Sequence, residues 1–145
     1  MIPDLSSRSA NEALNEMVLY LKGKKKIQKE KELFDKLIQR EELGSTAIGN
    51  GFAIPHCKIR NMKSPIVLLA ISKKGVDFHS LDGKPSKVFF LVISSPDNPS
   101  LSLQILATIA HLIRKTKTLR NKILNESEIG SILSVIKREE ERIHE

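Results

Sequence analysis

Apolar residues recur at helical spacing over the first part of the chain and predict two helices. Ser9 and Glu12 form a capping-box pattern at the start of the first helix, and Gly23 stops it. The second helix is predicted over residues 27–41, which places Arg40 in its last turn. The apolar positions are Ala10, Ala13, Leu14, Met17, Val18 and Leu21 in the first helix, and Leu33, Phe34, Leu37 and Ile38 in the second. Each helix therefore has one face that a core can bury.

Two apolar runs in the middle of the chain predict buried strands, over residues 65–71 and 87–94. The second run is nearly continuous in Val, Phe, Leu and Ile, which indicates a strand covered on both faces of its sheet. Between the runs, Gly75 predicts a turn, and Val76 and Phe78 alternate with polar neighbours as in a short edge strand.

A third helix is predicted after Pro99, and it carries apolar residues almost all round, so we expect it to be the most buried helix. Two shorter helices are predicted over residues 119–124 and 128–138, and the acidic run 139–141 is interpreted as a frayed end. Helices before, between and after strands predict an α/β fold. We expect a three-layer sandwich with a mixed β-sheet and helices on both faces, forming one domain over residues 1–145.

Composition indicates the cellular location of this domain and excludes some kinds of site. No apolar run reaches the roughly 18 residues that a bilayer-spanning helix requires, and the N-terminus does not resemble a secretory signal. We therefore expect a cytoplasmic protein without direct membrane insertion. A single cysteine, Cys57, excludes an internal disulfide framework and is too few for a cysteine-based zinc site.

The net charge of +7 is densest between Lys22 and Lys31, where the first two predicted helices meet. Such a cluster is the electrostatic footprint of a nucleic-acid binder. The chain has no Trp and one Tyr to stack on bases, however, and lysines also solvate helix ends. We favour the second interpretation and expect no nucleic-acid partner; steeply salt-dependent binding would support the first.

His56 is the candidate for chemistry because of the residues that precede it. Pro55 fixes its own backbone torsion and restricts Ile54 to an extended shape, so the imidazole has a stiff mount. The loop over residues 44–51 contains three glycines, which allow backbone N–H groups to converge on a phosphate, although such loops are also ordinary tight turns. The loop residues that we expect to bind phosphate are Ser45, Thr46, Gly49 and Gly51.

Other chemistries fit the same segment less well. Asn50 and Gly51 stand where a Walker A loop has Lys and then Ser or Thr. Cys57 beside His56 cannot form a thiol dyad on an extended strand, because adjacent side chains point to opposite faces. No spacing typical of metal ligands occurs, so we expect neither a metal nor a cofactor.

The segment from Arg40 to His56, REELGSTAIGNGFAIPH, closely resembles the signature of the type-2 IIA domains of the bacterial sugar phosphotransferase system. That family includes fructose and mannitol members and a nitrogen-regulatory branch. The similarity extends to residues 81–85 and to the loop over residues 96–99. The resemblance implies a mixed sheet with helices on both faces. It also implies a transferase component that carries a phosphoryl group on Nε2 of His56, delivered by HPr or a nitrogen-branch relative.

The resemblance also assigns roles to two residues outside the loop. Arg40 matches an arginine that the family places near its active histidine, and the alternative is a surface salt bridge. Ser102 stands where many members carry a second histidine, so onward transfer is less secure than acceptance. Two outputs therefore remain open. One is transfer to a IIB domain in sugar transport, and the other is a regulatory binding module that acts on a transporter or kinase.

Overall fold

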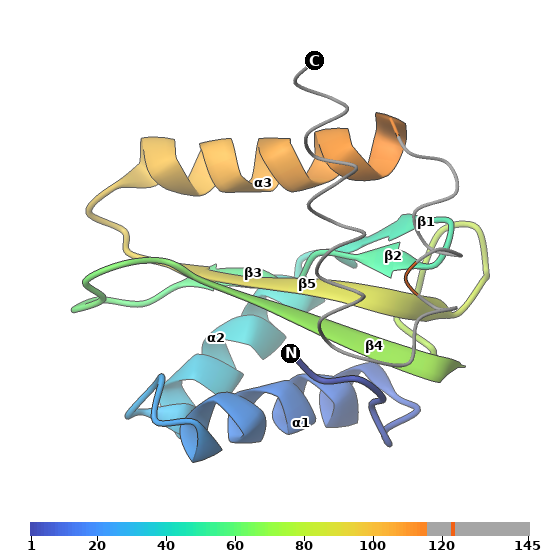
Figure 1. Ribbon diagram of the computed structural model, residues 1–145, viewed down its shortest axis with the longest axis horizontal. Coiled ribbons are helices and arrows are strands. Elements are labelled where there is room, and N and C mark those ends of the chain that lie inside the picture. The colour runs from blue at the N-terminus through green and yellow to red at the C-terminus, as the bar shows by residue number, and fades with distance from the viewer. Residues whose placement is uncertain (116–122, 124–145) are drawn as a thin grey trace.

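One mixed sheet forms the middle layer of the protein in the computed structural model, which describes residues 1–115 and residue 123 (Figure 1). Within this part of the chain the sheet has five strands. They are β1 (Ala47–Gly49), β2 (Phe52–Ala53), β3 (His56–Lys58), β4 (Ile66–Val76) and β5 (Ser86–Ser94). β5 pairs antiparallel with β4 along one edge, and parallel with β2 and then β3 along the other. β1 pairs antiparallel with β2.

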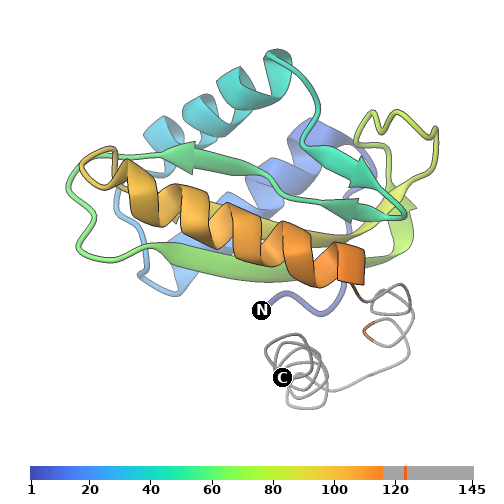
Figure 2. The same cartoon turned by 90° about the horizontal axis from the view of Figure 1, so that it is seen from above.

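Helices cover both faces of this sheet (Figures 1 and 2). α1 (Ala10–Gly23) and α2 (Glu30–Glu42) lie on one face, and α3 (Pro99–Lys115) crosses the other. Alternate residues of β5 supply the two cores, since Phe89, Leu91 and Ile93 pack with α1 and α2, whereas Val88, Phe90 and Val92 pack with α3. The predicted α/β sandwich with a mixed sheet is confirmed.

The start of α1 follows the predicted capping pattern. The Ser9 side chain accepts a hydrogen bond from the Glu12 N–H at 3.4 Å, and the helix ends at Gly23. α2 begins at Glu30, three residues later than predicted. The delay has a local cause: Lys25 adopts a φ of 59°, and the Lys26 N–H bonds back to the Leu21 carbonyl at 3.0 Å. Lys25 and Lys26 therefore complete the C-terminal capping motif of α1, so α2 begins only after them.

Gly75 does not make the predicted turn. β4 continues through it to Val76, and the pairing with β5 is irregular between Ile71 and Val76. Gly75 has a φ of 94°, and its N–H bonds to the Ser72 hydroxyl at 2.9 Å. Gly75 thus permits a β-bulge-like irregularity inside a long strand. Such an irregularity bends a strand without ending it. Phe78, predicted in a separate edge strand, lies beyond β4 and is buried against Phe89.

α3 is not the most buried of the described helices, contrary to the prediction. Its apolar residues extend round the helix, but only one side faces the sheet, and Leu103 is 68% exposed. In α1, by contrast, Leu14 and Met17 are completely buried. The segments predicted as helices over residues 119–124 and 128–138, and the run 139–141, lie outside the described residues apart from position 123. None of the described helices has the length and hydropathy needed to cross a bilayer.

Gly75→Ala is expected to destabilise the protein. A Cβ at this position would lie 2.8 Å from Pro85 Cβ, and the positive φ disfavours any L side chain. We expect a loss of about 1–3 kcal/mol in the free energy of unfolding, measured by urea denaturation. Gly23→Ala is the matched control, because a Cβ there meets nothing within 4 Å. Equal stabilities for the two variants would contradict this account of the strand.

Candidate phosphoryl-transfer site

His56 lies at the point where the sheet edge is interrupted. β2 and β3 run along the same edge of β5, separated by Ile54 and Pro55. The Pro55 carbonyl still accepts a hydrogen bond from the Val92 N–H at 2.9 Å, so the pairing with β5 continues across the gap. His56 is the first residue of β3 and pairs with Val92. Its half-buried side chain is therefore held on a short strand anchored to the central one.

The imidazole has a defined tautomer. Its Nδ1 lies 2.7 Å from the carbonyl oxygen of Ile54. Because a carbonyl oxygen only accepts, the proton of the neutral ring is assigned to Nδ1. The lone pair is then on Nε2, the nitrogen that the family resemblance assigns to phosphorylation. The sequence could not identify this partner, because a backbone oxygen leaves no signature in the residue pattern.

Arg40 reaches the same imidazole from the last turn of α2. Its Nε lies 3.4 Å from His56 Nε2, and its Nη1 donates to the Gly44 carbonyl at 2.8 Å. Arg40 forms no ion pair within the described part of the chain, so the surface salt bridge considered from the sequence is not found there. The Gly44 carbonyl instead fixes one arm of the guanidinium while the other faces the histidine.

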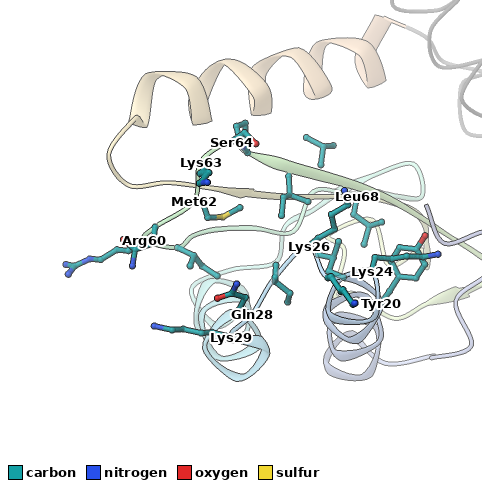
Figure 3. A pocket seen from close by; sticks show the side chains of 18 of the residues that line it. Tyr20, Lys24, Lys26, Gln28, Lys29, Arg60, Met62, Lys63, Ser64 and Leu68 are labelled. Atoms are coloured by element: carbon teal, nitrogen blue, oxygen red, sulfur yellow. The ribbon is translucent and has the colours of Figure 1, made fainter.

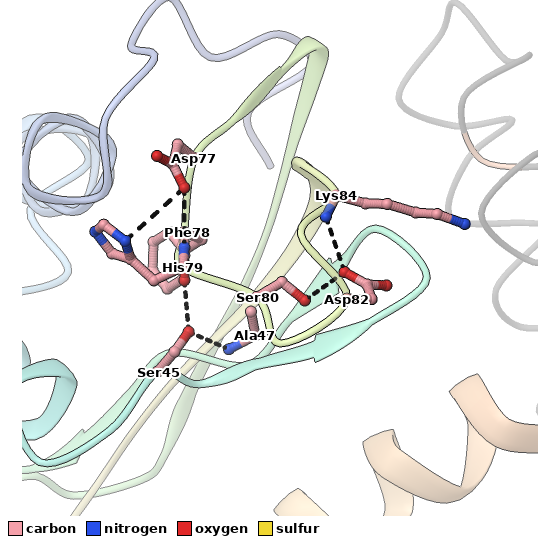
Figure 4. Close-up of polar contacts among 8 residues, drawn as sticks. All are labelled: Ser45, Ala47, Asp77, Phe78, His79, Ser80, Asp82 and Lys84. Carbon is pink, nitrogen blue, oxygen red and sulfur yellow. Dashed lines mark hydrogen bonds and ion pairs between the residues drawn. The ribbon is translucent and has the colours of Figure 1, made fainter.

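Ser45 and Thr46 lie next to Gly44, but their hydroxyls are committed elsewhere. The Ser45 hydroxyl donates to the Phe78 carbonyl and accepts from the Ala47 N–H (Figure 4). The Thr46 hydroxyl donates to the Glu41 carboxylate, which also accepts the Thr46 N–H at 3.0 Å. These bonds tie the segment after α2 to the rest of the domain. Both hydroxyls that the sequence placed at a phosphate therefore already have partners within the domain.

Gly49 and Gly51 are not brought to His56 either. They flank the turn of the β1–β2 hairpin, and the Gly51 carbonyl accepts from the Val88 N–H at 2.9 Å. His56 pairs with Val92, four residues farther along β5, a separation of about 13 Å at the usual rise of a strand. The glycines permit the hairpin turn, with φ values of 92° and 83°.

Asp82 anchors that hairpin, a role that sequence reasoning missed although residues 81–85 belong to the family resemblance. Its carboxylate accepts hydrogen bonds from the Ser80 hydroxyl at 2.7 Å and from the Lys84 N–H at 3.0 Å (Figure 4). It also accepts the Asn50 N–H at 3.0 Å. These hydrogen bonds lower the pKa of Asp82 to about 2, and the bond from Ser80 has the largest effect. The three donors favour the ionised carboxylate and hold the hairpin loop to the turn that precedes β5.

Ser102 lies in the first turn of α3 and is 5% exposed. Its hydroxyl accepts a hydrogen bond from the Ser94 hydroxyl at 3.0 Å, which joins α3 to the last residue of β5. Ser94 pairs with Lys58, two residues beyond His56. The Asn98 side chain accepts the Leu101 N–H at 3.2 Å, as a helix cap does. The start of α3 is thus fixed near the end of β3.

Cys57 faces away from the site. Its register partner Ile93 packs with α1 and α2, whereas Val92, the partner of His56, packs with α3. Burial raises the pKa of the Cys57 thiol to about 12, against a smaller opposing effect of the Lys36 charge. The thiol is therefore neutral at physiological pH, and its half-buried side chain packs against the core.

Comparison with known proteins agrees with this fold and with the resemblance seen in the sequence. Residues 1–139 match the family described as "Phosphoenolpyruvate-dependent sugar phosphotransferase system, EIIA 2". The chain belongs to this family, whose members are phosphotransfer components of that system.

Curated relatives come from both branches of the family. A nitrogen regulatory protein of Bradyrhizobium diazoefficiens is 34% identical over 139 residues, which cover 94% of this chain and 88% of the relative. The fructose-specific EIIABC component of Bacillus subtilis is 28% identical over 92% of this chain, but the match spans 21% of that longer protein.

Solved structures give the same picture. Nitrogen regulatory protein IIA-Ntr from Neisseria meningitidis superposes with a TM-score of 0.83 at 25% identity, covering 92% of this chain and 90% of that one. The Escherichia coli mannitol IIA, in a complex with phosphorylated IIB, has a TM-score of 0.75 at 12% identity, covering 94% and 93% of the two chains. The second likeness concerns the fold alone. Both a phosphocarrier role and a regulatory role fit these relatives.

The Cys57 thiol is expected to resist modification in the folded protein. With its pKa near 12, the thiolate is scarce at pH 8, and the half-buried side chain packs against the core. Reaction with a chromogenic disulfide reagent should be slow in native buffer and fast in urea, followed by absorbance. Lys36→Ala removes the charge that opposes the shift and should not accelerate the native reaction. Rapid labelling of the native protein would contradict the assigned burial.

Proposed function

We propose that the protein accepts a phosphoryl group on Nε2 of His56 from HPr or a nitrogen-branch HPr homologue, acting as one cytoplasmic domain. The observation that carries this proposal is the pair of contacts on the imidazole. The Ile54 carbonyl holds the proton on Nδ1, and Arg40 faces Nε2. The family membership supports the same reaction class.

The transfer follows from that geometry. The Nε2 lone pair attacks phosphorus in line with the donor's leaving group. A bond forms between Nε2 and phosphorus while the bond to the leaving group breaks, and the leaving group keeps the electron pair. Nε2 carries no proton that must first depart. Positive charge develops on the ring, and the Ile54 carbonyl stabilises it through the Nδ1–H bond.

Arg40 stabilises the transferred group in this proposal. Its hydrogen bond to Nε2 is long, at 3.4 Å, and gives way when phosphorus arrives. The guanidinium then donates to the equatorial phosphoryl oxygens, where the negative charge of the transition state is spread. The bond to the Gly44 carbonyl keeps the group in place during this exchange. The guanidinium therefore needs to move little during transfer, so reorganising it costs little free energy.

Partner proteins need apolar contacts around such a site, and the elements that form it supply them. Leu43 follows α2 and is 86% exposed, and Leu103 follows Ser102 and is 68% exposed. We infer that donor and acceptor dock over these leucines in turn, which places the donor's phosphoryl group at His56. Ser102 contributes indirectly in this proposal, by fixing the start of α3 through Ser94.

The alternative output is regulation, in which the phosphorylated protein binds or releases a transporter or kinase and passes little phosphate onward. The similarity to nitrogen regulatory proteins favours it, and so does Ser102, whose buried hydroxyl is bonded to Ser94. The input is the same in both cases: phosphorylation of His56.

His56→Ala is expected to abolish labelling of the protein by radioactive phosphoenolpyruvate in the presence of enzyme I and HPr. The substitution removes the nucleophilic nitrogen while leaving the backbone pairing of β3 available. His111→Ala, on the exposed side of α3, is the matched control and should label as the wild type does. Label on the His56→Ala protein would refute the assignment.

The labelled wild type also separates the two outputs. Loss of its label to an added IIB domain supports onward transfer. Retained label, together with capture of a transporter or kinase by only one phosphorylation state, supports regulation. Identical capture by both states would argue against a switch.

Arg40→Ala is expected to lower the rate of His56 phosphorylation on the order of 100-fold, because one charged donor to the transition state is lost. Arg40→Lys should recover part of the rate, since it keeps the charge and loses the planar fork. Lys36→Ala, one turn earlier on the same helix, controls for net charge. Rates come from the time course of labelling in quenched samples. Equal slowing by the Arg40 and Lys36 substitutions would show that only overall charge matters.

A further inference from the structure

A groove with a volume of about 880 Å³ lies where the connection between α1 and α2 faces the segment between β3 and β4 (Figure 3). The end of α1, the residues up to Lys29, residues 59–65 and the start of β4 line it. None of the proposed transfer residues His56, Arg40 and Ser102 is among them. The groove contains most of the basic cluster noted in the sequence, which the proposed function does not use.

The rim of this groove is cationic and lacks compensating charge. The basic side chains that line it are Lys24, Lys25, Lys26, Lys29, Lys63 and Arg60, all of them exposed. The described residues that line the groove include no Asp or Glu. The nearby Glu30 carboxylate is paired with Lys22. Burial and the charge of Lys24 lower the pKa of the Met1 amino group, as expected where positive charges gather.

The floor of the groove is apolar. Leu21 and Leu68 form its buried base, and four half-buried side chains lie above them. The half-buried residues are Ile27, Ile59, Met62 and Ile66. Apolar side chains that pack on the core on one side only leave area that a ligand can cover. A ligand that fits must therefore combine negative charge with apolar groups.

Two anionic ligands fit the lining less well. A glycine loop whose backbone N–H groups converge on a compact phosphate is absent, because no glycine lines the groove in the described part of the chain. Single-stranded nucleic acid needs free aromatic faces. The lining aromatic residue is Tyr20, whose ring lies 5.6 Å from Lys24 Nζ and whose hydroxyl accepts from the Met1 amino group at 3.1 Å. Its ring is thus already covered by a cation.

We propose that this groove binds an acidic amphipathic segment of a partner protein. Carboxylates of the segment pair with the lysine and arginine rim, and its apolar side chains cover the floor between Ile27 and Met62. Long lysine side chains suit this task, because their stems extend the apolar surface while their ammonium groups remain in water. The site does not depend on phosphorylation of His56.

A synthetic peptide that repeats Glu-Glu-Leu, labelled with a fluorophore, tests the proposal by fluorescence anisotropy against the full chain. Binding should occur at low salt and weaken as salt rises, since rim ion pairs are screened. A Glu-Glu-Ser peptide should bind more weakly, and a Lys-Lys-Leu peptide should not bind. Absence of binding by Glu-Glu-Leu at low salt, or equal binding by the serine peptide, would overturn the proposal.

Variants locate the binding site. The double variant Lys26→Glu with Lys63→Glu should weaken peptide binding at least about fivefold, because it reverses two rim charges. The matched control is Lys31→Glu with Lys36→Glu, which makes the same charge change on α2 outside the groove. If both double variants weakened binding equally, the effect would come from net charge alone, and the assignment of the peptide to this groove would be wrong.

Two further measurements separate the remaining outcomes. His56→Ala should bind the peptide as the wild type does, so failure of the phosphoryl-transfer proposal leaves this one standing. A single-stranded oligonucleotide of matched charge should bind more weakly than the Glu-Glu-Leu peptide. Tighter oligonucleotide binding that the groove variant abolishes would assign the groove to nucleic acid and overturn the proposal.

Discussion

The pairing of β5 with strands on both of its edges is the constraint on which the rest of the structure depends. β5 is buried along nearly its whole length, so its backbone polar groups need partners on both sides. β4 supplies one side over a long antiparallel register, and β2 and β3 share the other. A proline separates these two short strands, and the chain tolerates it because Pro55 offers its carbonyl to Val92 without needing to donate. The interruption places His56 at a sheet edge whose position β5 fixes.

The candidate site is built mainly from backbone atoms, which explains how far sequence could predict it. The pattern around Pro55 identified His56, and the family signature added Arg40, and the structure brings these two together. It also shows that the Ile54 and Gly44 carbonyls orient them, which no residue pattern encodes. The residue pattern could not show that the Ser45 and Thr46 hydroxyls bond to a carbonyl and a carboxylate, because a hydroxyl serves such groups as readily as a ligand. Nor could the pattern show that Gly49 and Gly51 lie in a hairpin that meets β5 four residues away from the partner of His56.

The sequence pattern predicted helices and strands correctly where capping, spacing and residue type determine them. The Ser9 cap, the apolar face of α1 and the buried run of β5 all follow from spacing and residue type. The errors at Gly75 and in α3 arose where tertiary contacts determine the structure. Gly75 resembles a turn residue, yet pairing with β5 carries the strand through it. The apolar surface of α3 exceeds what one sheet face can cover, so periodicity overstated its burial. The extent of the basic cluster also depends on tertiary contact. Residues 59–65 are distant in sequence, and only the fold brings Arg60 and Lys63 beside the lysines that follow α1.

The hydroxyl pair of Ser94 and Ser102 has a consequence for how this protein can diverge. Both side chains are buried, and Ser94 donates to Ser102. An apolar residue at position 102 removes that acceptor and leaves the buried Ser94 hydroxyl without this partner, at a cost of about 1–3 kcal/mol. Exchange of Ser102 alone is therefore expected to cost stability that a second change at Ser94 can restore.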